Sequence, residues 1–91
     1  MNQQLHAYIS GRVQGVWYRA NTQKVAQNLQ LTGWVRNLDD GRVELLAVGK
    51  ETQLNKLLDW CRQGPEGSRV TNIDFKMSEV EKAFNSFEIT A

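Results

Sequence analysis

The sequence predicts an α+β fold of the ferredoxin-like, split βαβ type, in the order β-α-β-β-α-β plus a short C-terminal strand. Apolar residues alternate in some segments and recur every three or four residues in two others, and glycine-containing connections separate these segments. Each helical segment carries one apolar stripe, so both helices can cover one face of an antiparallel sheet. The 91 residues are expected to form a single domain, residues 1–91.

The first half of the chain contains a strand, a helix and a hairpin. The first strand is predicted from the alternating apolar residues Leu5, Ala7 and Ile9. The helix that follows has its stripe at Tyr18, Thr22, Val25, Ala26 and Leu29. Gly33 is expected to end this helix, because glycine readily adopts the left-handed conformation found after a helix terminus. Residues 34–38 and 42–48 then form two strands around the tight turn at 39–41.

The second half contains a helix and two further strands. The helix follows Gly49 and ends at Gly64-Pro65, and its stripe is Leu54, Leu57, Leu58 and Cys61. A strand is predicted from Val70 to Met77, with a bulge or a late start because Val70 and Ile73 are out of phase. The last strand covers residues 86–90, with Phe87 and Ile89 pointing inward.

Composition excludes several classes of partner. Eleven basic and ten acidic residues give a net charge of +1, too balanced for a protein that binds nucleic acid through its phosphates alone. No apolar run approaches the roughly 20 residues that span a bilayer, and the N-terminus lacks the pattern of a signal peptide. One cysteine and no cluster of metal-ligating residues predict neither a disulfide nor a metal site. We expect a cytoplasmic monomer with no membrane or nucleic-acid partner.

The connection GRVQGVWYRA, residues 11–20, has the composition of an anion-binding loop. Gly11 and Gly15 permit positive φ angles, so successive backbone N–H groups can converge on an anion. Arg19, in the first turn of the helix, can donate two parallel hydrogen bonds to phosphate oxygens. If the two glycine-containing connections meet, Arg12, Arg19, Arg36 and Arg42 would form one local anion site. The same glycines would equally suit an ordinary turn between a strand and a helix.

Two segments closely resemble the signatures of a known family. GRVQGVWYR at 11–19 and GWVRNLDDGRV at 33–43 are similar to the acylphosphatase patterns G-x-V-Q-G-V-x-F-R and G-W-V-x-N-x-x-x-G-x-V. The resemblance implies a hydrolase that cleaves the carboxyl–phosphate bond of acyl phosphates without a cofactor, with inorganic phosphate as product and inhibitor. One departure is Tyr18, where the family usually carries phenylalanine.

The resemblance also implies roles for individual residues. Arg19 and the loop backbone would bind the phosphoryl group, and Asn37 would position the attacking water. The loop backbone here means four residues: Gly15, Val16, Trp17 and Tyr18. The loop offers no Cys, Ser, Thr or Asp as a nucleophile, which favours direct attack by water.

A second class of function stays open on the sequence. A non-catalytic phosphate-, anion- or RNA-binding module could use the same scaffold, because binding and hydrolysis would share one pocket. The strand at 41–48 has no aromatic residue on which an RNA base could stack, which counts against RNA. Without the second signature, Asn37 would suit a structural role at the end of its strand.

Overall fold

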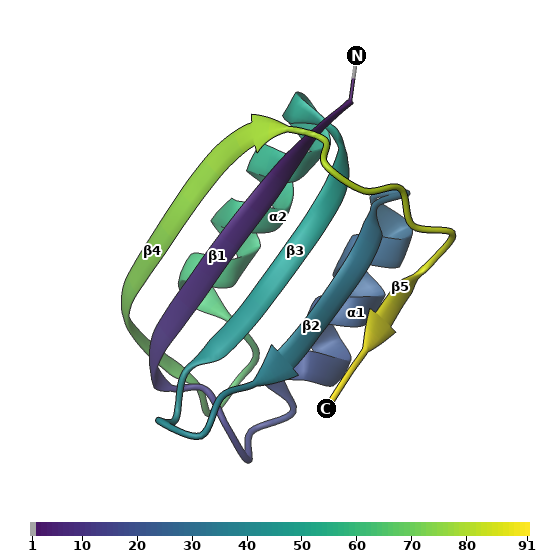
Figure 1. Cartoon of the computed structure of the whole chain (residues 1–91). Coiled ribbons are helices and arrows are strands. Elements are labelled where there is room, and N and C mark those ends of the chain that lie inside the picture. Colours follow the sequence, from purple (N-terminus) through teal and green to yellow (C-terminus); the bar gives the residue numbers. More distant parts are fainter. Residues whose placement is uncertain (1) are drawn as a thin grey trace.

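The computed structural model describes residues 2–91 and has two layers, a five-stranded sheet and two helices that both lie on one face of it (Figure 1). The elements in chain order are β1 (Asn2–Arg12), α1 (Tyr18–Asn28), β2 (Thr32–Asn37), β3 (Val43–Lys50), α2 (Glu51–Gln63), β4 (Arg69–Glu79) and β5 (Phe87–Ile89). The predicted fold class and order of elements are confirmed.

The sheet has the strand order β4-β1-β3-β2-β5. The four longer strands pair antiparallel, as predicted, and the short β5 adds a parallel pairing along the outer edge of β2. This pairing sets Phe87 beside Gly33 and Ile89 beside Val35. The C-terminus therefore ends close to the N-terminal end of α1, as Figure 1 shows.

The core lies between the sheet and the helices. The inward residues of β1 and the stripe of α2 are fully or almost fully buried, as their periodicity predicts: Leu5, Ala7, Ile9, Leu54, Leu57, Leu58 and Cys61. Burial of each large aliphatic side chain contributes about 1.5–3 kcal/mol. Phe87 joins this core, whereas Ile89 is 40% exposed, so only the first of the two residues predicted to point inward is buried.

The predicted irregularity in the fourth strand is a bulge next to the first connection. Ser10 pairs with Asn72 but Gly11 pairs with Val70, so Thr71 is an extra residue on β4. Gly11 has φ +122°, and a Cβ atom there would lie 2.1 Å from the carbonyl oxygen of Arg69. Only glycine permits this close approach of the two backbones at the bulge.

The prediction that Gly33 ends the first helix is wrong. The left-handed residue after α1 is Gln30, with φ +60°. Its N–H donates to Gln27, and the N–H of Leu31 donates to Ala26, which is the Schellman pattern of helix termination. Gly33 lies instead inside β2 with φ +133°, where its backbone packs against the carbonyl of Leu46.

Candidate active site

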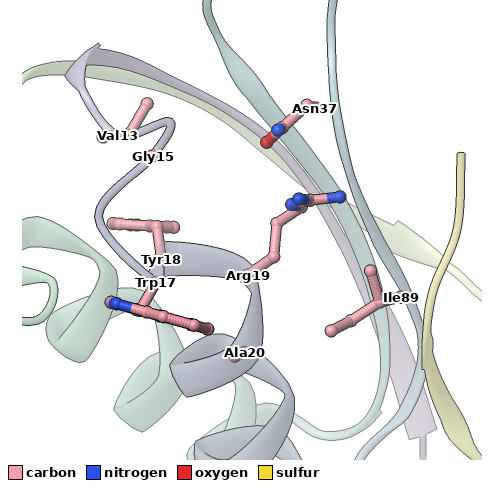
Figure 2. Close-up of a pocket in the computed structure, with 8 residues that line it drawn as sticks. All are labelled: Val13, Gly15, Trp17, Tyr18, Arg19, Ala20, Asn37 and Ile89. Carbon is pink, nitrogen blue, oxygen red and sulfur yellow. The ribbon is translucent and has the colours of Figure 1, made fainter.

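A cavity of about 410 Å³ opens at the N-terminal end of α1 (Figure 2). Its walls come from the loop after β1, the first turn of α1, the end of β2 and β5. The lining residues are Val13, Gly15, Trp17, Tyr18, Arg19, Ala20, Asn37 and Ile89. The two segments that carry the sequence signatures therefore meet in space.

The loop between β1 and α1 has the backbone of an anion-binding nest. Gly15 and Trp17 have positive φ angles, +75° and +66°. Gln14, which precedes Gly15, and Val16, which lies between the two, do not have positive φ. This alternation turns successive N–H groups toward one side. It leads directly into α1, whose first N–H groups have no intrahelical partner. The N-cap of α1 has no side-chain hydrogen bond and its first turn has no acidic residue, so neither a capping side chain nor a first-turn carboxylate offsets this positive end.

Arg19 and Asn37 extend into the cavity from different elements. Figure 2 shows their polar ends near each other, one reaching from α1 and the other from the end of β2. Within residues 2–91, Arg19 forms no ion pair with a carboxylate. The side-chain oxygen of Asn37 is buried and has no hydrogen-bond partner in the same part of the chain. A free guanidinium and an unpaired amide oxygen thus border one space, which is the arrangement expected of groups that bind something other than protein.

Gln14 joins the loop to the β2–β3 turn. Its side-chain amide nitrogen donates to the carbonyl oxygens of Leu38 and Arg42, at 2.8 and 2.9 Å. The turn is closed by its own hydrogen bond from the N–H of Leu38 to the oxygen of Arg42. Asn37 directly precedes this turn, so Gln14 links the loop after β1 to the strand end that carries Asn37. Sequence reasoning did not identify Gln14, because its partners lie 24 and 28 residues away.

The predicted cluster of four arginines does not form. Of the four, only Arg19 lines the cavity. Arg36 binds the Glu44 carboxylate at 2.7 Å and Arg42 binds Asp40 at 2.8 Å. Alternation along β2 explains the first case, because Arg36 faces away from the side of the sheet that holds Val35 and Asn37.

Glu44 is a buried carboxylate on the open face of the sheet, away from the cavity. Burial alone would raise its pKa, but hydrogen bonds from His6 and Arg36 outweigh this, and the pKa lies below its ordinary value. The stability that this carboxylate contributes is present above its ordinary pKa and is lost as the pH falls through the lowered one. Glu44 is therefore a structural charge at neutral pH.

The Tyr18 hydroxyl, the departure from the family pattern, is buried and donates to the carbonyl oxygen of Cys61 at 2.7 Å. That carbonyl belongs to the last turn of α2, where its usual partner four residues on would be the N–H of residue 65. Residue 65 is proline and has no N–H. Tyr18 therefore supplies the hydrogen bond that Pro65 cannot, and links the start of α1 to the end of α2. Burial, followed by the neighbouring Cys61 side chain, raises the Tyr18 pKa well above its ordinary value.

Tyr18→Phe is expected to lower the free energy of unfolding by about 1–2 kcal/mol, because it leaves the buried Cys61 carbonyl without a donor. Urea unfolding followed by tryptophan fluorescence measures this change. Hydrolytic activity at a temperature where both proteins are folded should change little, since the hydroxyl points away into α2. A variant as stable as the parent would show that water replaces the hydroxyl.

The sequence is similar to known acylphosphatases over most of its length. A sequence model of the family described as acylphosphatase matches residues 5–89. An acylphosphatase from Methylococcus capsulatus is 51% identical over 85 residues, covering 93% of this chain and 92% of the relative. The chain belongs to the acylphosphatase family.

Solved acylphosphatase structures agree with this membership. The crystal structure of acylphosphatase from Bacillus subtilis matches with a TM-score of 0.95 and 38% identity, covering 98% of this chain and 99% of that one. An acylphosphatase from Coxiella burnetii matches with a TM-score of 0.92 and 38% identity, over 98% and 93% of the two chains. The split βαβ sheet with two helices on one face is thus the acylphosphatase fold.

Residues 2–91 contain no group of three or more His, Cys, Asp or Glu side chains placed to hold a metal ion. No helix in that range is long and apolar enough to cross a membrane.

Proposed function

We propose that the cavity at the N-terminus of α1 is the active site of this acylphosphatase, with Arg19 and Asn37 as its catalytic residues. Family membership defines the reaction, hydrolysis of an acyl phosphate to a carboxylate and inorganic phosphate. One observation carries the assignment of the site. An uncapped helix N-terminus, a nest of backbone N–H groups, a free guanidinium and an unpaired buried amide oxygen border the same space.

The phosphoryl group binds in the loop. The backbone N–H groups of Gly15, Val16, Trp17 and Tyr18 surround its oxygens, and Arg19 adds a charged, planar donor pair. Phosphoryl transfer develops charge on the three equatorial oxygens, so fixed donors around them stabilise the transition state. The helix dipole adds to this field, because no acidic side chain in the first turn opposes it.

Asn37 orients the attacking water. Its unpaired oxygen accepts a hydrogen bond from the water, but a neutral amide does not take up a proton at neutral pH. The water oxygen bonds to phosphorus as the bond between phosphorus and the carboxyl oxygen breaks. The electron pair leaves with the carboxylate, whose pKa of about 4 makes protonation by a general acid unnecessary. One proton stays on the new phosphate oxygen and the other passes to a second oxygen of the same phosphate.

The hydrolase is favoured over a non-catalytic binding module. Donors alone suffice to bind an anion, yet Asn37, which lines the cavity, also has an unpaired acceptor oxygen, and this suits a water rather than a phosphate oxygen. RNA binding through the open face of the sheet is disfavoured. Arg42 and Arg36 lie over the rings of Tyr8 and Trp34, 4.8 and 5.0 Å from the ring centres, where bases would stack.

We further propose that the enzyme acts as a cytoplasmic monomer on a small-molecule substrate, without a nucleic-acid or membrane partner. The balanced charge of +1 and the single, buried Cys61 support this proposal. Light scattering after size exclusion and fractionation of cells that express the tagged protein test the two parts separately.

Acyl phosphates should be hydrolysed orders of magnitude faster than phosphate monoesters of similar shape, because the cavity offers no acid to protonate an alkoxide leaving group. Inorganic phosphate should inhibit competitively, and chelators should leave the rate unchanged. Release of phosphate from both substrate classes, with and without chelator, measures these outcomes. Comparable rates on ester and anhydride would contradict the proposed chemistry, and so would activity lost on metal removal and restored by adding metal.

A further inference from the structure

Gln14 connects two parts of the candidate site without lining the cavity itself. Its side-chain nitrogen donates two hydrogen bonds, to the carbonyl oxygens of Leu38 at 2.8 Å and Arg42 at 2.9 Å. The same two oxygens accept the turn's own bonds, from the N–H groups of Gly41 and Leu38. A carboxamide suits this position, because one uncharged group supplies two donors to two acceptors. Gln14 therefore binds the turn as one unit.

Sheet pairing does not connect the loop and the turn directly. The loop follows β1 and the turn follows β2, but β3 lies between β1 and β2 in the sheet. Within residues 2–91, the two bonds from Gln14 are the only hydrogen bonds between the loop at 13–17 and the turn at 38–42. Gln14 therefore supplies the hydrogen bonds that set the place of the loop relative to the turn.

The carbonyls that Gln14 binds lie next to the residue proposed to orient the water. Leu38 directly follows Asn37 in the chain. Arg42 directly precedes Val43, which is the partner of Asn37 in the β2–β3 ladder. The side-chain oxygen of Asn37 has no hydrogen-bond partner in the described part of the chain, so its position depends on that of its backbone. A shift of the turn would therefore move this oxygen relative to the loop.

We propose that Gln14 is a positioning residue, which sets the distance between the loop after β1 and the Asn37 oxygen and affects the rate through Asn37. The inference rests on the proposed function. In-line attack requires the water to lie opposite the leaving carboxylate, and a misplacement of about 1 Å can cost about 10²-fold in rate. Loss of the Gln14 side chain leaves the N–H groups of the loop and Arg19 in place, so phosphate binding does not require this link.

The test is a double-mutant cycle of Gln14→Ala and Asn37→Ala, with kcat measured on acetyl phosphate. Gln14→Ala alone should lower kcat about tenfold and change the inhibition constant of inorganic phosphate by less than about twofold. In the Asn37→Ala background the same substitution should lower kcat by less than about twofold, because the group through which Gln14 acts is already absent. General damage to the loop would lower kcat by the same factor in both backgrounds.

Gln14→Glu keeps the size of the side chain and supplies a second measurement if Gln14→Ala does not fold. An ionised carboxylate accepts hydrogen bonds but donates none, so at neutral pH this variant should lose at least as much kcat as Gln14→Ala. Its kcat relative to the parent should rise as the pH falls through the carboxyl pKa, since the protonated group donates one hydrogen bond to the turn. A ratio that does not change with pH would contradict the role of the donor.

Gln4→Ala is the matched control. Gln4 also forms two side-chain hydrogen bonds across the fold, with Glu81 at 2.9 and 3.2 Å, but it lies near the start of β1 and outside the cavity. Its loss should lower the urea midpoint of unfolding and leave kcat unchanged. Equal loss of kcat on Gln14→Ala with and without Asn37, or unchanged kcat in both Gln14 variants, would overturn the inference. No turnover of acetyl phosphate by the parent would instead refute the proposed function.

Discussion

Asn37→Ala is expected to lower kcat by about 10²-fold or more while the affinity for inorganic phosphate stays nearly unchanged. The reason is the role proposed for Asn37, whose unpaired oxygen would contact the attacking water and not the phosphoryl group. Initial rates with an acyl phosphate give kcat, and competitive inhibition or calorimetry gives the phosphate affinity. Normal turnover by a folded Asn37→Ala variant would contradict its role.

Arg19→Gln serves as the matched comparison, because it removes the group that we propose to bind the phosphoryl oxygens in both the ground state and the transition state. Phosphate affinity and kcat should therefore both fall, unlike in Asn37→Ala. Arg19→Lys should recover little, since a point charge does not replace the planar pair of donors. Unchanged phosphate binding by Arg19→Gln would contradict the assignment. Circular dichroism and melting temperature check that both variants keep the fold.

Gly33→Ala is expected to produce the largest loss of stability among the glycine-to-alanine changes in this chain, about 3 kcal/mol or more. A Cβ at residue 33 would lie 1.9 Å from the carbonyl oxygen of Leu46, and the φ of +133° is unfavourable for alanine. Relief requires β2 and β3 to separate, which breaks the ladder that carries Asn37. Against a total stability of about 5–15 kcal/mol, much of the protein would unfold at moderate temperature. Urea unfolding measures the difference.

Gly41→Ala is the control for this experiment. Gly41 also has positive φ, at +96°, but a Cβ there would meet nothing within 4 Å. Its cost is the backbone conformation alone, about 1 kcal/mol. If Gly33→Ala and Gly41→Ala lost equal stability, the contact between β2 and β3 would not be the cause at Gly33.

Local periodicity was enough to predict the helices and strands of this fold. Sequence reasoning failed at a glycine, because glycine occurs both at helix ends and where two strands approach closely. The stripe of α2 and the alternation in β1 predicted which residues are buried, because each element presents one face to the core. Gly33 was assigned to a helix end because glycine commonly occurs there. The structure uses its missing side chain for contact between strands, and Gln30 accepts the left-handed conformation instead. Sequence alone does not distinguish these two uses.

The site was predictable in part. The residues named by the two signatures, such as Gly15, Arg19 and Asn37, line one cavity, while their catalytic roles remain predictions. Ile89 was missed as a lining residue because its place depends on the parallel pairing of β5 with β2, for which the sequence gives no local signal. The prediction of an arginine cluster was wrong because it considered only how close each arginine lies in sequence to the loops. That closeness does not determine on which face of the sheet an arginine side chain lies.

Gln14 has a consequence for the thermodynamics of substrate binding. One carboxamide nitrogen joins the phosphate loop to two carbonyls of the neighbouring turn, so the nest and the end of β2 are ordered together when the chain folds. The conformational entropy of these segments is lost when the chain folds, so it does not reduce the free energy of substrate binding. The loop and the end of β2 are therefore already ordered before the substrate binds. A chain of this size then does not need the closure of a lid to order them. In these 91 residues the shared ordering keeps the groups of the candidate site in one geometry between binding events.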